Sequence, residues 1–263
     1  MVPQGSQTRD SGSDWPLALV PWPLSLTPEA MHSVIAIDGP SGAGKGTVAR
    51  AVAAALGFRH VDTGAMYRAV AWRASRLGLD LDNEDAVLQV ARGAVLDVAG
   101  SAVVIDGHDV STAIRTPEID RATTRVARLP RVRAELVDRQ RALASLGGVV
   151  MEGRDIVTVV FPAADVKIYL DASPDERARR RASDPAHTAA QTQALADIAQ
   201  AMQRRDENDR TRQASPLTIA PDATVIDTTG VPVAQVVERV LVIVGAKMAA
   251  RPASTSAPAS TAS

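Results

Sequence analysis

The chain has 263 residues, of which 46% are apolar, and it contains no cysteine. This length allows one domain with insertions or two small domains, and the lack of cysteine excludes disulfides and thiolate metal sites. A formal net charge of −1 gives no bulk attraction to nucleic acid or to an anionic membrane, and a cysteine-free chain is compatible with a reducing cytoplasm.

Both ends of the chain differ in composition from the rest. We expect residues 1–30 to be a disordered extension, 31–248 a folded domain and 249–263 a disordered tail rich in Ala, Ser, Thr and Pro. The apolar stretch 15–26 contains three prolines and lacks a clear basic segment before it, so it is a poor signal peptide and Met31 is a candidate start. The apolar stretch 233–244 is interrupted by charged residues, so we expect no membrane span and a cytoplasmic protein.

A glycine-rich loop follows the first expected strand, 34–37, and leads into a helix that continues to Leu56. Its residues are Gly39, Pro40, Ser41, Gly42, Ala43, Gly44, Lys45, Gly46 and Thr47. Glycines let successive backbone N–H groups point into one hollow, and a helix N-terminus and a lysine add positive charge there. This order predicts a site for the β- and γ-phosphates of ATP and disfavours the alternative of a chance glycine turn. Gly46 stands where Ser or Thr is usual, so Thr47 is the candidate Mg²⁺ ligand.

A second short strand is expected at 58–61, followed by a helix that Asp62 or Thr63 can cap. Arg68 lies early in that helix, where the helix dipole disfavours a cation. A bound anion would relieve this conflict, and an ion pair with a nearby carboxylate is the alternative.

Short apolar runs at 94–98, 102–105 and 108–110 are separated by turn residues, which predicts a small antiparallel sheet within an insert at about 84–115. Helices are then expected to begin at Thr116-Pro117 and at Pro130.

Two further buried strands, 149–151 and 166–170, end in charged residues. Ser173 to Glu176 form a capping box for a helix that we interpret as the start of a lid at about 177–192. The lid helix carries Arg177, Arg179, Arg180 and Arg181. A solvated face with Glu176–Arg180 and Asp175–Arg179 pairs is the alternative.

A helix from about residue 191 places Arg205, Asp209 and Arg212 on one face. A last strand at 223–226 and a last helix at 233–244 complete the pattern. Five strands alternating with helices predict an α/β fold with a parallel sheet and helices on both faces. Ligands bind such sheets beyond the carboxyl ends of the strands, where the glycine-rich loop and clusters 62–68, 152–155 and the region after Asp171 all fall.

The many arginines predict a triphosphate donor together with a phosphorylated acceptor, because one triphosphate does not need them all. A mobile lid that carries arginines would exclude water from the phosphoryl group.

Several motifs in order make the chain resemble the bacterial cytidylate kinases, among the P-loop nucleoside monophosphate kinases. They are GPSGAGKGT at 39–47, DTGAMYR at 62–68, RVR at 131–133, EGRD at 152–155, FP at 161–162 and KIYLDAS at 167–173. The resemblance covers about 34–247 and implies transfer of the ATP γ-phosphate to CMP or dCMP with Mg²⁺, with a core, a nucleotide-binding insert and a lid.

The resemblance also implies roles for individual residues. Lys45, Arg154, Arg180 and Arg181 would act on the transferred phosphoryl group. Thr63, Arg68 and Arg154 would hold the CMP phosphate, Thr124, Arg133 and Asp155 the base, and Arg205, Asp209 and Arg212 the sugar and the phosphate side. Thr124 stands where the family has a serine, and Asn208 stands where an arginine is expected.

The base-reading set also follows from hydrogen bonding. A carboxylate at Asp155 can accept from the cytosine N4 amine, whereas uracil presents an acceptor there, and Arg133 can donate to O2 or N3. A structural pair between Asp155 and Arg154 or another arginine is the alternative.

Three other functions remain open at this point. They are a P-loop kinase of UMP, AMP or shikimate, a nucleotide-dependent switch without a small-molecule acceptor, and nucleic-acid binding, which the near-zero net charge and few aromatic residues disfavour. We expect a monomer that uses small-molecule substrates.

Overall fold

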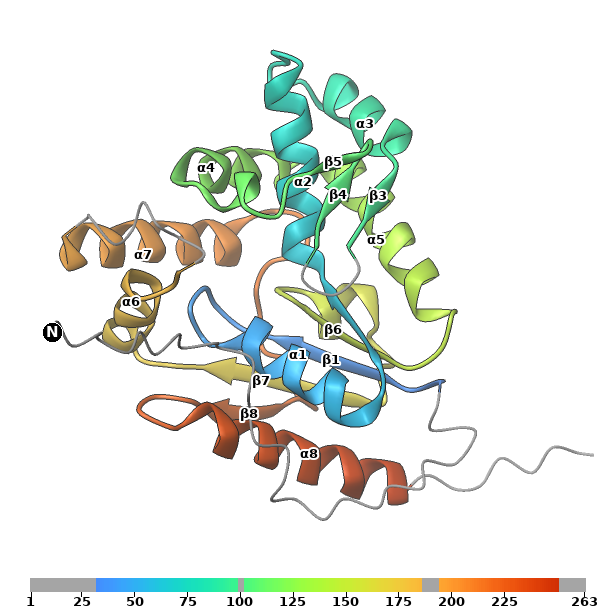
Figure 1. Ribbon diagram of the computed structural model, residues 1–263, viewed down its shortest axis with the longest axis vertical. Helices are drawn as coiled ribbons and strands as arrows, with labels where there is room; N and C mark the ends of the chain where they lie inside the picture. Colours follow the sequence, from blue (N-terminus) through green and yellow to red (C-terminus); the bar gives the residue numbers. More distant parts are fainter. Residues whose placement is uncertain (1–31, 99–101, 186–193, 251–263) are drawn as a thin grey trace, which may run out of the picture.

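A five-stranded sheet forms the centre of the computed structural model, which describes residues 32–98, 102–185 and 194–250 (Figure 1). Its strand order is β2 (Arg59–Asp62), β6 (Val149–Gly153), β1 (Val34–Asp38), β7 (Val166–Asp171) and β8 (Thr224–Asp227). All four neighbouring pairs are parallel. The predicted parallel α/β sheet is therefore confirmed, with β2 and β8 each shifted by one residue from the predicted bounds.

Alternating strand residues face two separate layers of helices. Ile35 and Ile37 pack in the core formed with α1 (Lys45–Leu56) and α8 (Val233–Ala249), whereas Ala36 packs in the core on the opposite face. These strands are rich in Val and Ile because both faces of a parallel sheet are buried. The last helix continues five residues beyond the predicted end at Val244.

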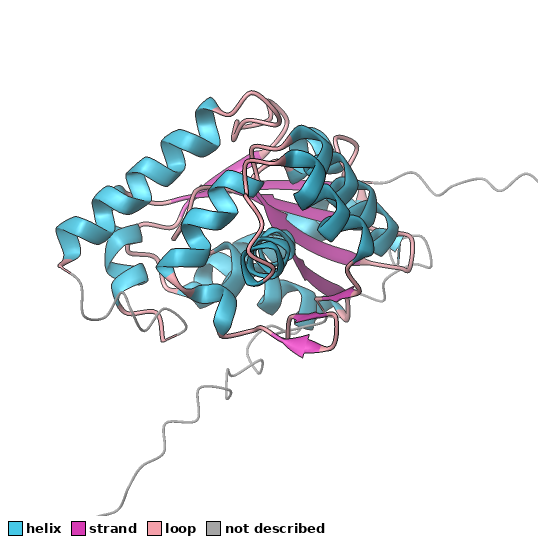
Figure 2. Cartoon of the chain, turned by 90° about the horizontal axis from the view of Figure 1, so that it is seen from above, coloured by secondary structure: helices cyan, strands magenta, loops and turns pink. Residues whose placement is uncertain are grey.

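The second layer contains α2 (Thr63–Arg76), α3 (Glu84–Gly93), α4 (Pro117–Val126) and α5 (Pro130–Ala144) (Figures 1 and 2). Helix α2 packs against α4, and α3 packs against α5. Their starts follow local signals that the sequence displays: the Asp62 carboxylate accepts from Ala65 N at the start of α2, and prolines begin α4 and α5.

The insert contains the predicted antiparallel sheet, with β3 (Leu96–Asp97), β4 (Val104–Ile105) and β5 (His108–Asp109). Asp106 and Gly107 both have positive φ in the turn between β4 and β5, as a tight two-residue hairpin requires. A short 3₁₀ helix, η3 (Ala113–Arg115), then leads to α4.

Two helices follow β7, and the first of them, α6 (Pro174–Ala182), contains the start of the predicted lid. In α6 the Ser173 hydroxyl accepts from Glu176 N, which confirms the predicted cap. Helix α7 (Leu195–Thr211) packs against α6. Helix α7 begins at Leu195 and not near residue 191. The disordered tail predicted at 249–263 was wrong at its first residue, because Ala249 ends α8. The expected disorder of 1–30 and 251–263, and the lid from 186 to 192, concern residues outside those that the structure describes. Among the described residues, no helix has the length and apolar character to cross a membrane.

Three of the described elements, α3, η3 and a segment called η4, were not predicted. A π-helical segment, η4 (Ile156–Val160), follows β6 and is held to the end of β1 by Asp38. The Asp38 carboxylate accepts from the N–H groups of Ile156 at 3.1 Å and Val157 at 2.9 Å. Burial raises the pKa of Asp38 to about 6, although these two hydrogen bonds act to lower it.

The close approach of the glycine-rich loop to β7 makes Gly39 a sensitive position. Its φ is +150°, and a Cβ there would lie 2.0 Å from the backbone oxygen of Leu170. We expect Gly39→Ala to lower the free energy of unfolding by about 2–4 kcal/mol, because backbone must move to relieve the overlap. Chemical denaturation should measure this loss. The control Gly93→Ala, where a Cβ meets nothing within 4 Å, should change stability little, and equal effects would contradict the argument.

Candidate active site

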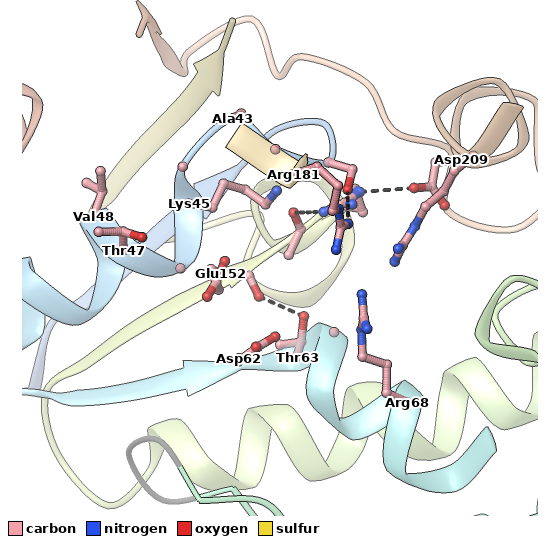
Figure 3. Close-up of a pocket in the computed structure, with 18 of the residues that line it drawn as sticks. Ala43, Lys45, Thr47, Val48, Asp62, Thr63, Arg68, Glu152, Arg181 and Asp209 are labelled. Carbon is pink, nitrogen blue, oxygen red and sulfur yellow. Dashed lines mark hydrogen bonds and ion pairs between the residues drawn. The ribbon is translucent and has the colours of Figure 1, made fainter. Parts of the chain in front are cut away.

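A cavity of about 680 Å³ lies beside the carboxyl ends of β1, β2 and β6 (Figure 3). It brings together nearly all the predicted site residues. Those that line it are Ser41, Gly42, Ala43, Gly44, Lys45, Gly46, Thr47, Thr63, Arg68, Thr124, Arg133, Arg154, Asp155, Arg180, Arg181, Arg205, Asp209 and Arg212. Gly39 and Pro40 do not line it, and Arg115 is the one described residue of the predicted insert that does.

The glycine-rich loop has the backbone geometry of a phosphate-binding loop. Gly42 and Gly44 have φ values of +78° and +89°, and Gly44 is the N-cap of α1, so the open end of this helix faces the cavity. Lys45 Nζ donates to the backbone oxygen of Pro40 at 2.8 Å. Burial, together with the positive charge of Arg154, lowers the pKa of Lys45 to about 7. A bound polyphosphate would reverse this shift by supplying negative charge.

Arg68 and Arg205 contact the same carboxylate across the cavity. Arg68 Nη2 lies 2.7 Å from Asp120 Oδ1, and Arg205 Nη1 lies 2.8 Å from the same oxygen. Burial lowers the pKa of Arg68 to about 10. The alternative for Arg68, an ion pair with a nearby carboxylate, is therefore present, and Arg68 also lines the cavity.

A second ion pair joins Arg154 to α7. Arg154 Nε donates to Asp209 Oδ2 at 3.0 Å, and Arg212 Nη1 lies 3.5 Å from Asp209 Oδ1. Burial acts to raise the pKa of Asp209, but the positive charges of Arg154, Arg205 and Arg212 outweigh it and lower the pKa. Arg212 is the C-cap of α7 with extended backbone, so the prediction that it continues the helical face was wrong, although its side chain still reaches the cavity.

Asp155 pairs with Arg133 and not with Arg154, so the alternative of a structural pair with an arginine stays open beside the base-reading hypothesis. Arg212 Nη2 lies 3.7 Å from the other Asp155 oxygen, and the Arg133 guanidinium lies 5.2 Å from the centre of the Tyr67 ring. Among the described residues, Tyr67 Oη, Arg133 Nε and Arg212 Nη2 are buried without a hydrogen-bond partner. Buried polar atoms rarely lack partners, so this part of the cavity is suited to a polar ligand.

Arg180 and Arg181 lie beside the phosphate-binding loop. Arg180 donates to Glu176 at 2.9 Å and to the hydroxyl and backbone oxygens of Thr228 at 2.9 and 2.6 Å, and Arg181 Nη2 donates to Ser41 Oγ at 2.9 Å. The Glu176–Arg180 pair that sequence offered as an alternative is therefore present. The Asp175–Arg179 pair is not, because Arg179 contacts Glu176 instead at 2.9 Å.

The two threonines are oriented by the backbone. The Thr63 hydroxyl donates to the Glu152 carbonyl at 2.7 Å, and the Thr124 hydroxyl donates to the Asp120 carbonyl at 3.1 Å. Asn208, which stands where an arginine was expected, accepts from Arg128.

The residues near Thr47 fit a Mg²⁺ ion held partly by a nucleotide. The cavity lining contains the Thr47 hydroxyl and the carboxylates of Asp62 and Glu152, and oxygen atoms are the ligands that Mg²⁺ prefers. No group of three or more His, Cys, Asp or Glu within the described ranges could hold a metal by itself.

Comparison with known proteins matches residues 35–246 to the family described as cytidylate kinase. The chain belongs to the cytidylate kinase family. The cytidylate kinase of Desulfitobacterium hafniense is 49% identical over 79% of this chain and 90% of its own length. That of Pelotomaculum thermopropionicum is 48% identical over 81% and 96%, and that of Solibacter usitatus 45% identical over 82% and 93%. The fold is thus that of the P-loop nucleoside monophosphate kinases, and ATP is the phosphate donor that a cytidylate kinase of this family implies.

Sequence reasoning missed several residues of this cytidylate kinase site. Arg115 lines the cavity, and Asp120 forms ion pairs with arginines that line it. Asp38 positions the segment after Asp155. The position of Asp38, a carboxylate at the end of the first strand, was a signal that could have identified it. Asp120 had none, because its partners Arg68 and Arg205 are 52 and 85 residues away in the chain.

Proposed function

We propose that the chain transfers the γ-phosphate of ATP to CMP or dCMP, giving ADP and CDP or dCDP. The observation that carries this proposal is that Asp155 lies in the same cavity as the phosphate-binding loop, together with buried polar atoms of Tyr67, Arg133 and Arg212 that lack a hydrogen-bond partner among the described residues. The family relationship supports the same activity.

For the donor, we assign the triphosphate to the loop from Gly39 to Thr47. Lys45, Arg154, Arg180 and Arg181 would neutralise the charge of the phosphoryl group during transfer, which is the main catalytic demand of this reaction. Thr47 would hold Mg²⁺, which supplies further positive charge to the donor phosphates when bound. These four cationic side chains all line the same cavity, which supports the assignment.

For the acceptor, we assign the phosphate to Thr63, Arg68 and Arg154, and the sugar and the phosphate side to Arg205, Asp209 and Arg212. Asp155, Arg133 and Thr124 would bind the base. An ionised phosphate oxygen of CMP is itself the nucleophile, so this reaction needs no side chain as an obligatory general base.

A carboxylate at Asp155 favours cytosine over uracil. It can accept from the cytosine N4 amine, whereas the O4 of uracil would face it as a second acceptor and leave both groups unpaired. We further propose that 31–248 works as a monomeric, cytoplasmic kinase domain whose lid extends over about 177–192.

An ATP-coupled assay of purified protein over CMP, dCMP, UMP, AMP and shikimate tests the proposal. We expect kcat/KM for CMP or dCMP to exceed that for UMP and AMP by about 100-fold or more. Preference for UMP, AMP or shikimate, or ATP hydrolysis that needs no acceptor, would contradict it.

A further inference from the structure

Arg177 and Asp206 form a buried ion pair between α6 and α7. They are 7% and 2% exposed, and Arg177 Nη1 contacts Asp206 Oδ2. Arg177 was predicted to belong to a mobile lid, yet neither residue lines the substrate cavity. The pair therefore needs an explanation other than direct contact with substrate.

Both residues bind the backbone of the same loop residue. Asp206 Oδ1 accepts from Ser41 N at 3.2 Å, and Arg177 Nη1 donates to Ser41 O at 3.1 Å. Arg177 Nε also donates to the Ala172 carbonyl at 3.1 Å, directly after β7. The peptide groups of Ser41 are thus held from both sides by one closed set of charge-assisted hydrogen bonds.

The loop also packs against α6 and α7 without spare room. A Cβ at Gly42 would lie 2.8 Å from Met202 Cε and 2.9 Å from Arg177 Cβ. The loop thus packs tightly against the two helices, and the ion pair holds the peptide groups of Ser41 in one orientation.

A carboxylate next to a phosphate-binding loop is unfavourable for ATP unless its charge is compensated, which Arg177 does. Asp206 also occupies the N–H of Ser41, which a phosphate could otherwise use. A buried ion pair is weak evidence for stability by itself, since its desolvation cost can exceed its Coulombic gain. Its contacts with Ser41 point instead to a role in placing the loop.

Helix α7 contributes to the acceptor side of the cavity at neighbouring positions. Arg205 precedes Asp206 and contacts Asp120 of α4, and Asp209 lies three residues further and contacts Arg154. One helix therefore contacts both the donor loop and the proposed acceptor site.

We propose that Arg177 and Asp206 are positioning residues that fix the phosphate-binding loop to α6 and α7, so that the ATP site and the acceptor residues on α7 keep one relative placement. This inference rests on the proposed function for its kinetic part. It does not require either side chain to touch substrate.

Asp206→Asn is the first test. An asparagine that accepts from Ser41 N turns its amide N–H₂ toward Arg177, a second donor, so the closed set is broken. We expect KM for ATP to rise about tenfold while KM for CMP stays within about twofold, and amide hydrogen exchange to become faster over 39–47. Arg179→Met, on α6 beside Arg177 and 61% exposed in its side chain, is the control and should change none of these values.

The double variant Arg177→Met with Asp206→Met separates placement from stability. It removes both buried charges, so the melting temperature should stay near that of the wild type while KM for ATP and exchange over 39–47 remain raised. Wild-type values of KM for ATP and of exchange over 39–47 in the folded variants would overturn the proposal. Loss of folding in both variants would also overturn it, because the pair would then be a determinant of the fold.

Calorimetric binding of ATP alone and hydrogen exchange need no acceptor. They test the loop placement even if the wild-type chain proves not to phosphorylate CMP, so a failure of the proposed function and a failure of this inference give different results.

Discussion

Lys45→Ala is expected to lower kcat for CMP phosphorylation by about 10²–10³-fold, the usual cost of removing one preorganised charge from a transition state. The Lys45 side chain is buried in the wall of the cavity at the start of α1, and burial lowers its pKa to about 7. The negative charge of a bound triphosphate favours the ammonium form, so the variant loses a full positive charge where the phosphoryl group moves.

Steady-state kinetics with saturating ATP and CMP measure this loss. The matched control is Lys247→Ala, an exposed lysine in α8 that is absent from the cavity lining, and its kcat should equal that of the wild type. Near-normal turnover of the Lys45 variant would refute the proposed role of the loop.

Asp155→Asn is expected to lower kcat/KM for CMP by about 10²-fold and to bring the CMP/UMP ratio close to unity or below it. The carboxylate is the acceptor in the proposed contact with the cytosine N4 amine. An amide can turn its N–H₂ toward the O4 of uracil, so UMP should lose much less than CMP.

The ratio is its own control for partial unfolding, because a loss of folded enzyme lowers both rates equally. This matters because the change leaves Arg133 and Arg212 with less negative charge in a buried site. Asp222→Asn, which removes an exposed partner of Lys167, should leave the ratio unchanged. An unaltered CMP/UMP ratio in the Asp155 variant would show that its pair with Arg133 is structural.

Much of the fold could be predicted because its signals are local. The apolar runs of β1, β6 and β7, the caps at Asp62 and Ser173 and the Asp106-Gly107 turn each depend on neighbouring residues. The order of the strands depends on long-range pairing, and the π-helical segment depends on Asp38, 118 residues before Ile156.

The same distinction explains what was missed in the site. The phosphate-binding loop and the EGRD segment at 152–155 are contiguous motifs, so their residues could be placed together. The ion-pair partners Asp120 and Asp206 come from other helices, and no local pattern identifies an acidic residue that neutralises an arginine far away in the chain.

The carboxylate of Asp120, shared by Arg68 and Arg205, has a consequence for affinity. If these two guanidinium groups hold the acceptor phosphate as proposed, binding is an exchange of anions: the incoming phosphate displaces a resident carboxylate. The measured affinity is then a difference between two strong attractions, so many arginines do not imply tight binding. By the same exchange, the Asp120 carboxylate would replace the phosphate on the two arginines when the phosphorylated acceptor leaves, which favours its release.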